Sequence, residues 1–244
     1  MKKIVLALAI AALIASPAYA DYANRVIVGS DNFDSYANGA LVGQGPWTGT
    51  APDTDIFVDS GNVGINVNAL DYTEAYWNIP DIGPGAGNRL WVRLDISLGS
   101  GTAGNMWSFQ ADAEAWDGSN NFARLYGPPT SARPRIDGYG LVLNPFTLTG
   151  GWDRFEFIID TAATTSEFIV NGVSQGTLNY SVTGAYPALG TLWFDSWNRE
   201  MTDGVVWFDN LAYGYINDVP EPSSLAAFAM FGLGALGFIK RRRA

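Results

Sequence analysis

Residues 89–98 read Arg-Leu-Trp-Val-Arg-Leu-Asp-Ile-Ser-Leu, and this alternation decides the fold class. Aliphatic side chains at every second position point to one side, while Trp91, Arg93 and Asp95 point to the other. A period of two is that of a β-strand with one face on an apolar core. The stretch therefore predicts a strand with one buried face and one outward face.

The same alternation recurs further along the chain. Residues 107–114 and 154–160 again place apolar and polar side chains on opposite faces. Asn171-Gly172 separates two β-like runs and supplies the two positive-φ residues that a type I′ hairpin turn needs. Residues 205–213 are predicted to form a closing strand. Short runs of this kind, separated by Gly, Pro, Asn and Asp, predict an all-β fold, a two-sheet antiparallel jelly-roll sandwich.

The composition of the 244-residue chain excludes several classes of function. The chain contains neither cysteine nor histidine, so it has no disulfide, no Cys/His metal site and no catalytic triad that needs either residue. Residues 21–220 carry eight arginines, no lysine and 23 acidic residues, a balance of −15. So acidic a surface repels phosphate backbones, which excludes nucleic acid as a partner.

The N-terminal segment, residues 1–20, has the three parts of a secretory signal peptide. Two lysines precede an apolar run at 4–14, and small residues follow the run. The pattern Ala18-x-Ala20 marks a signal-peptidase site, so cleavage is predicted to leave Asp21 as the first residue. The apolar run is too short for a permanent membrane span.

The C-terminal segment, residues 219–244, also has three ordered parts. The extended motif is Pro220-Glu221-Pro222, and the basic tail is Lys240-Arg241-Arg242-Arg243. Between them, residues 223–239 would span about 26 Å as a helix, enough for a thin membrane. By the positive-inside rule the basic tail stays in the cytoplasm, so the part between the two end segments faces away from it.

This order of parts resembles the PEP-CTERM sorting signal. The resemblance implies recognition by an exosortase, a membrane protease that cleaves near the motif. It also implies a transient stay in the inner membrane of a Gram-negative bacterium, then release or transfer to the cell surface or extracellular matrix. Proteins with this signal resemble components of systems that make extracellular polysaccharide, so polysaccharide is an expected partner. The alternative is a permanent C-terminal anchor in which the two prolines only stop a helix.

Three short motifs between the end segments carry a second resemblance. They are Asp31-Asn32-Phe33-Asp34-Ser35-Tyr36 with the following Gly45-Pro46-Trp47, then Trp152-x-Arg154-Phe155-x-Phe157, and Trp207-Phe208-Asp209-Asn210-Leu211. Residues 21–218 are thereby similar to concanavalin A-like lectin and glucanase domains of the laminin-G-like branch. The resemblance implies one sandwich with a convex and a concave sheet. Two smaller β modules are the alternative.

Gln110, Asp112 and Glu114 alternate along one predicted strand and therefore share a face. Glucanases on the resembled fold place Glu, Asp and Glu at this spacing, one as nucleophile and one as acid/base. Gln110 departs from that pattern, because an amide has no negative charge with which to attack an anomeric carbon. The plainest interpretation is the polar outer face of an ordinary strand. A glycoside hydrolase or lyase that uses Asp112 and Glu114 is the alternative.

All nine tryptophans lie between the two end segments. Exposed rings stack on sugar faces, but most large aromatic side chains of a sandwich belong to its core. Trp107, Trp152 and Trp207 lie near apolar alternations and are predicted to be buried. Trp91, which shares its face with Arg93, is the predicted exposed ring. Together with the polar face of 110–114, this pair is predicted to line one glycan groove.

Asp31, Asp34 and Asp209 would meet if the first and last strands pair, and their carboxylates suit Ca²⁺. No EF-hand loop is present, and capping of turns by Asp31 and Asp34 is the simpler interpretation. The sequence identifies no definite cofactor, and structural Ca²⁺ is the one that stays open. For the whole chain we predict an exported surface or matrix protein with non-catalytic glycan binding. A structural adhesin that contacts other proteins is the further alternative.

Overall fold

The computed structural model describes residues 24–52, 54–66, 72–83, 89–99, 106–113, 121–127, 132–135, 146, 148–179, 188–197 and 204–217. Within these ranges the chain forms strands and no helix. No helix able to cross a membrane therefore occurs there. The predicted signal peptide (1–20) and sorting segment (219–244) lie outside the described residues.

Fifteen strands are described. They are β1 (Arg25–Asp31), β2 (Gly39–Ala40), β3 (Thr48–Gly49), β4 (Ile56–Asp59), β5 (Asn62–Asn66), β6 (Thr73–Ile82), β7 (Arg89–Ser97), β8 (Met106–Ala113), β9 (Asn121–Gly127), β10 (Arg133–Arg135), β11 (Trp152–Asp160), β12 (Thr165–Val170), β13 (Val173–Asn179), β14 (Leu189–Trp197) and β15 (Val205–Ile216).

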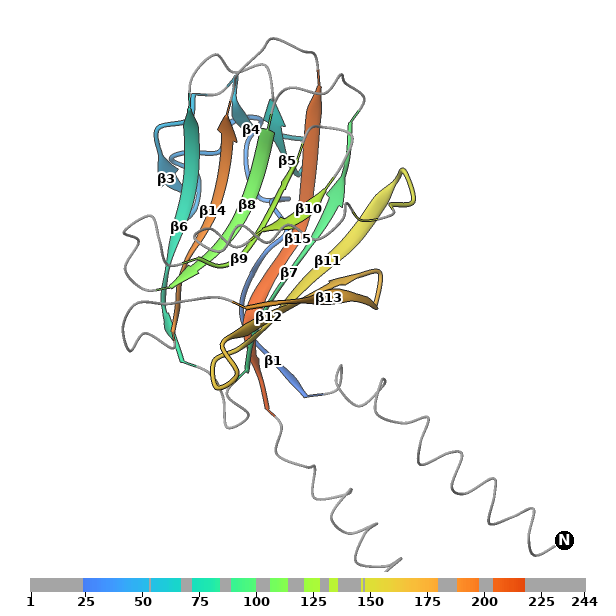
Figure 1. Ribbon diagram of the computed structural model, residues 1–244. Coiled ribbons are helices and arrows are strands. Elements are labelled where there is room, and N and C mark those ends of the chain that lie inside the picture. Colours follow the sequence, from blue (N-terminus) through green and yellow to red (C-terminus); the bar gives the residue numbers. More distant parts are fainter. Residues whose placement is uncertain are drawn as a thin grey trace, which may run out of the picture.

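The strands form two antiparallel sheets that pack face to face (Figure 1). The nine-stranded sheet has the order β13-β12-β11-β7-β15-β5-β4-β2, with β1 paired to β15, and the six-stranded sheet has the order β10-β9-β8-β14-β6-β3. Strands that follow each other in the chain often lie in different sheets, as β7 and β8 do. This arrangement confirms the predicted two-sheet sandwich.

The alternation of the sequence sets which side chains form the core. The inward side chains of β7, β8 and β11 are all at most 1% exposed: Leu90, Val92, Leu94, Ile96, Trp107, Phe109, Ala111, Phe155, Phe157 and Ile159. Each fully buried aliphatic or aromatic side chain contributes roughly 1.5–3 kcal/mol to folding. The predicted inward faces of these strands are therefore confirmed.

The three tryptophans predicted to be buried differ from one another. Trp107 is fully buried, but Trp152 is 48% exposed, so that prediction is wrong. Trp207 is only half-buried, with its ring edge-on to Phe57 at 5.6 Å. The reason is parity along the strand: Phe155 and Phe208 point inward, so Trp152 and Trp207, an odd number of positions away, point outward.

The turn between β12 and β13 has the predicted conformation. Asn171 and Gly172 have φ values of 50° and 78°, as a type I′ turn requires. The side chain of Asn171 also reaches back to β11. Its Oδ1 accepts a hydrogen bond from the Arg154 backbone N–H at 2.9 Å, and its Nδ2 donates to Asp153 Oδ1 at 2.6 Å. The tip of the hairpin is thereby tied to the start of β11.

The first and last strands pair, as expected, with Asp31 opposite Leu211. At the other end of the pair, the Asn217 N–H donates to the Asn24 carbonyl at 2.8 Å. In Figure 1 these two chain ends lie side by side at one end of the sandwich. Both predicted processing segments are thus joined to the same end of the fold.

Candidate functional site

The outer face of the six-stranded sheet carries the polar residues of β8. Ser108 and Gln110 lie on this face because Trp107 and Phe109 point into the core. Gln110 pairs across the sheet with Trp193 of β14 and with Arg124 of β9. The register therefore brings charged, amide and aromatic groups from three strands together.

A buried polar cluster forms at this position. The amide of Gln110 donates to Asp195, and the Arg124 Nη2 atom lies 3.5 Å from each Asp195 carboxylate oxygen. The exposed fractions are 5% for Gln110, 3% for Arg124 and 1% for Asp195. Buried charges need such partners, because their desolvation is otherwise costly.

The cluster limits the chemistry that this face can perform. As the donor to Asp195, the Gln110 amide has no charge and cannot act as a nucleophile. Asp112 lies on the same strand and is fully buried. Glu114, the third residue of the predicted pattern, lies outside the described residues.

Aromatic side chains flank the cluster on β14 and β6. The ring centroids of Trp193 and Tyr76 are 5.5 Å apart, and the two residues pair across the strands. Tyr72, just before β6, is 47% exposed and donates a hydrogen bond to Glu74 at 2.9 Å. Partial burial is the main reason why the pKa of the Tyr72 hydroxyl is raised, and the negative charge of Asp195 raises this pKa further. The Tyr72 hydroxyl therefore stays protonated at neutral pH, with its proton donated to Glu74.

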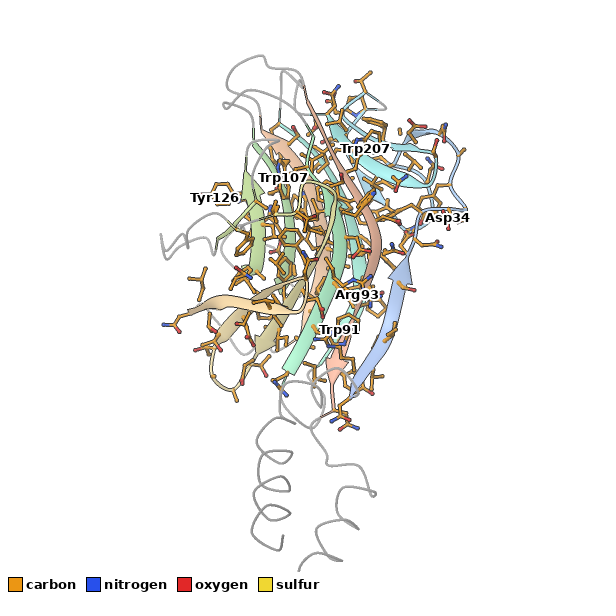
Figure 2. The ribbon with its side chains drawn as sticks, turned by 90° about the vertical axis from the view of Figure 1, so that its right-hand side faces the viewer. Asp34, Trp91, Arg93, Trp107, Tyr126 and Trp207 are labelled. Atoms are coloured by element: carbon orange, nitrogen blue, oxygen red, sulfur yellow. The ribbon has the colours of Figure 1, made fainter. Side chains whose placement is uncertain are left out.

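Trp91 and Arg93 lie on the other sheet, on the outer face of β7. Figure 2 shows both beside β1 and well apart from Tyr126, which pairs with Ser108 of β8. The predicted single groove is therefore wrong, because β7 and β8 belong to different sheets. The predicted exposure of Trp91 is also wrong, since its ring is 1% exposed.

Two guanidinium groups cover Trp91. The Cζ atoms of Arg25 and Arg93 lie 5.4 Å and 5.9 Å from the ring centroid. Aliphatic side chains of β11, β12 and β15 pack around the ring on the same outer face: Ile158, Ile169, Ala212 and Ile216. The sequence predicted the face of the strand on which Trp91 lies. It did not predict that Arg25 covers the ring, because Arg25 comes from a strand 66 positions earlier.

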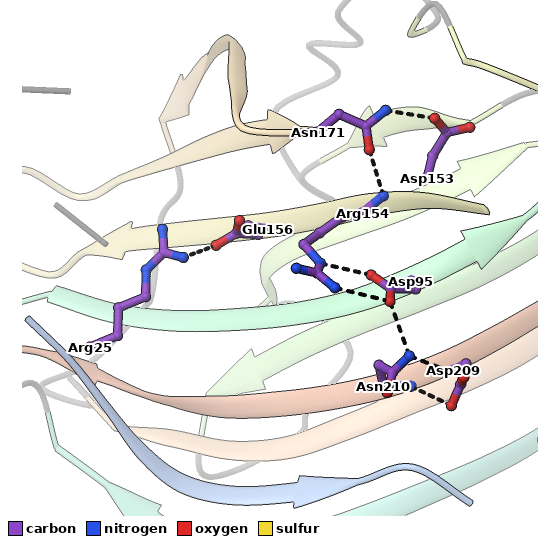
Figure 3. A network of polar contacts seen from close by, with 8 residues as sticks. All are labelled: Arg25, Asp95, Asp153, Arg154, Glu156, Asn171, Asp209 and Asn210. Carbon is purple, nitrogen blue, oxygen red and sulfur yellow. Dashed lines mark hydrogen bonds and ion pairs between the residues drawn. The ribbon is translucent and has the colours of Figure 1, made fainter. Parts of the chain in front are cut away.

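A network of ion pairs extends across β7, β11 and β15 (Figure 3). The Arg154 Nε and Nη2 atoms donate to Asp95 at 2.9 and 3.3 Å, and the Asn210 amide donates to the same carboxylate at 3.1 Å. Arg25 forms an ion pair with Glu156, which is 2% exposed. Burial raises the pKa of Glu156 against the attraction of the neighbouring guanidiniums.

This network was missed at the sequence level, although a signal for it was present. Arg93 and Asp95 alternate on β7, and Arg154 and Glu156 alternate on β11. Antiparallel pairing sets Arg93 opposite Glu156 and Asp95 opposite Arg154, so residues of opposite charge face each other along the two strands. The complementary order of the four charges would have predicted that the two strands are neighbours.

Among the predicted metal ligands, the charges of Asp31 and Asp34 act on the carboxylate of Asp209. Asp31 caps a turn: its carboxylate accepts from the Phe33 N–H at 2.9 Å, the Tyr36 hydroxyl at 2.5 Å and the Trp47 indole N–H at 3.0 Å. Among the described residues no group of three or more carboxylates could hold a metal ion. Turn capping by Asp31 is confirmed, and a calcium ion at this cluster stays a prediction.

Asp209→Asn is expected to raise the free energy of unfolding at pH 7 by at most about 0.5 kcal/mol. The melting temperature should rise slightly as a result. Burial, together with the charges of Asp34, Asp95 and Asp31, raises the pKa of Asp209. The ionised carboxylate therefore destabilises the fold at neutral pH, and this penalty disappears as the pH falls through the folded and then the unfolded pKa.

Melting curves of the full-length chain in EDTA at pH 7 and pH 4 measure this difference, with Glu167→Gln as the control. The gain should shrink toward pH 4. The electrostatic interpretation fails if Ca²⁺ stabilises the wild type and Asp209→Asn loses that stabilisation. Such a result would establish Asp209 as a calcium ligand.

Residues 218–243 match the PEP-CTERM protein-sorting motif. This confirms the predicted sorting signal, which implies exosortase processing and export to the cell surface. No curated protein sequence matches the chain.

Solved structures show the same fold at low sequence identity. Bacillus licheniformis β-glucanase is 12% identical, with a TM-score of 0.52, over 76% of this chain and 97% of that one. The alginate lyase Aly36B is 15% identical, with a TM-score of 0.52, over 77% and 96%. A sialidase is 14% identical, with a TM-score of 0.58, over 77% of this chain, which spans only 18% of the sialidase. At these identities the likeness establishes the jelly-roll fold alone.

Proposed function

We propose that this chain is an exosortase-processed surface or matrix protein of a Gram-negative bacterium, whose sandwich binds polysaccharide without cleaving it. The sorting motif supports the export route, and the jelly-roll fold supports a carbohydrate ligand. The observation that carries the non-catalytic part is the Gln110 amide, which donates to the buried carboxylate of Asp195. A retaining glycosidase would instead need an ionised carboxylate at the position of Gln110, to act as the nucleophile.

The outer face of the six-stranded sheet is the proposed binding face. Tyr72 and Tyr76 offer rings that are partly open to solvent, next to the cluster around Gln110. Rings of this kind cover the apolar faces of sugars, while nearby polar groups bind the hydroxyls. Since the similar structures include a β-glucanase, neutral β-glucans are the first probes.

Tyr76→Ala is expected to weaken β-glucan binding about tenfold, because a sugar ring loses its stacking surface. Binding of the full-length chain to immobilised laminarin measures the effect. Trp152→Ala removes an aromatic side chain from the opposite sheet and should leave laminarin binding unchanged. Equal losses in the two variants would contradict the proposed face.

The alternatives give different results with the same protein. Release of reducing ends from laminarin, abolished by Asp112→Ala, would make the chain a glycoside hydrolase and end the non-catalytic proposal. Binding to no glycan would favour the structural adhesin.

The protein recovered from the surface and medium of its native host is expected to begin at Asp21 and to end near Pro220. An extended Pro-Glu-Pro segment is open to a protease because proline prevents helix formation. Intact-mass measurement checks both ends at once. A membrane-bound species that retains residues 225–244 would show a permanent anchor and contradict transient anchoring.

A further inference from the structure

A pocket of about 540 Å³ lies on the outer face of the nine-stranded sheet, on the opposite side of the sandwich from the proposed glycan face. Strands β1, β7 and β11 and the β12–β13 turn form it. Its charged and aromatic lining consists of Arg25, Arg93, Asp95, Trp152, Arg154 and Glu156. The volume is within the usual range for ligand sites.

Positive charge is concentrated in this pocket. Three of the eight arginines between residues 21 and 220 line it, on a stretch whose overall balance is −15. Two of the three have acidic partners, because Arg154 pairs with Asp95 and Arg25 pairs with Glu156 (Figure 3). The pocket therefore holds one more cation than it has carboxylates.

Arg93 is the cation that supplies the excess charge. In the part of the chain that the structure describes, no carboxylate forms an ion pair with Arg93, and its Nε atom is buried without a hydrogen-bond partner. The guanidinium contacts the Trp91 ring and faces the pocket. A guanidinium with free donors favours a carboxylate, which it can bind through two parallel hydrogen bonds.

Trp152 adds a second kind of contact to the same pocket. Its ring is 48% exposed at the start of β11. Trp152 pairs with Ser97 and Glu156 pairs with Arg93, so the Trp152 and Arg93 positions are four residues apart along the strands. At roughly 3.3 Å per residue this separation is about 13 Å. A ligand that touches both groups is therefore longer than a single small anion.

The neighbouring cavity extends the site in the other direction. It measures about 560 Å³, and Arg93 lines both cavities. Tyr36 and Asn210 line this second cavity only. A polymer bound at Arg93 can therefore continue from one cavity into the other. The acidic remainder of the domain repels a polyanion only at short range, because charges further apart than about 8 Å are screened at physiological salt.

We propose that this pocket is a second carbohydrate site, which binds a uronic acid-containing polysaccharide. Arg93 binds the carboxylate of one uronate residue, and Trp152 stacks on another sugar of the same chain. The site does not depend on glycan binding at the six-stranded sheet.

Binding of the full-length chain to immobilised polygalacturonate tests the proposal. Arg93→Gln keeps an uncharged stem over Trp91 and is expected to weaken binding about tenfold, and Trp152→Ala about threefold. Arg89→Gln is the matched control: it removes the same charge from the same face of β7, but Arg89 does not line the pocket. Laminarin binding should be unchanged in all three variants.

Three results would overturn the proposal. Equal losses in Arg89→Gln and Arg93→Gln would mean that only net charge matters. Unchanged polygalacturonate binding by a normally melting Arg93→Gln would exclude the carboxylate contact. Inorganic phosphate or dextran sulfate that competes as well as galacturonate oligosaccharides would make the pocket a general oxyanion site. Because laminarin tests the other sheet, either site can fail while the other holds.

Discussion

Phe194→Ala is expected to lower the free energy of unfolding by about 4 kcal/mol. Phe194 of β14 is fully buried between the two sheets. Its ring centroid lies 4.9 Å from that of Phe208, 5.1 Å from Trp47 and 5.2 Å from Phe109. Phe208 belongs to the nine-stranded sheet and Phe109 to the six-stranded sheet, so the substitution opens a cavity where the sheets meet.

Urea unfolding of the full-length chain, followed by tryptophan fluorescence, measures this loss. Val173→Ala is the control, because that side chain is 62% exposed and its truncation should change stability by no more than about 0.5 kcal/mol. A loss below about 1.5 kcal/mol for Phe194→Ala would show that the ring does not hold the sheets together. Since native domains are stable by only about 5–15 kcal/mol, the expected loss would also reduce the amount of folded protein at the cell surface.

Asp195→Asn is expected to cost about 3 kcal/mol, because it removes the negative charge that faces the buried Arg124 guanidinium. Arg124 and Asp195 are 3% and 1% exposed. Asparagine keeps the shape of the side chain and one acceptor for the Gln110 amide, so the variant isolates the loss of charge. The expected loss reflects the larger strength of a charge pair in a low-dielectric site.

Asp95→Asn is the matched control, since it makes the same change in an arginine–aspartate pair on the other sheet. Arg154 and Asp95 are 49% and 14% exposed, so solvent screens their attraction. The expected cost is less than about 1 kcal/mol, as for other exposed pairs. Both variants are compared by urea unfolding at pH 7. Equal costs would mean that burial does not set the strength of the Arg124–Asp195 pair.

The face on which strand side chains lie and the type of the hairpin turn followed from neighbouring residues alone. The aliphatic side chains from Leu90 to Ile96 alternate with Trp91, Arg93 and Asp95, and the structure places the aliphatic ones in the core as expected. Asn171-Gly172 forms the predicted turn because both residues tolerate positive φ. The motif at 218–243 was identified from its ordered parts.

Contacts between distant parts of the chain determined which residues meet in each site. Gln110 meets Asp195 across 85 positions, and Arg154 meets Asp95 across 59. Trp152 was predicted to be buried although its parity with Phe155 places it on the outer face, and Trp91 was predicted to be exposed although other strands cover it, so both predictions were wrong. Alternation states on which face a side chain lies, whereas the packing of other strands decides whether that face is covered.

By itself, the sequence determined the C-terminal sorting motif, the all-β class and the face on which each side chain of a strand lies. These properties depend on local backbone geometry and on the order of residues along the chain. Only the tertiary structure decided that Arg93 and Gln110 lie on opposite sheets, that Arg25 covers Trp91 and that Trp152 borders a pocket with three arginines. Those outcomes depend on which strands become neighbours, and the pairing is set by packing of the whole sandwich.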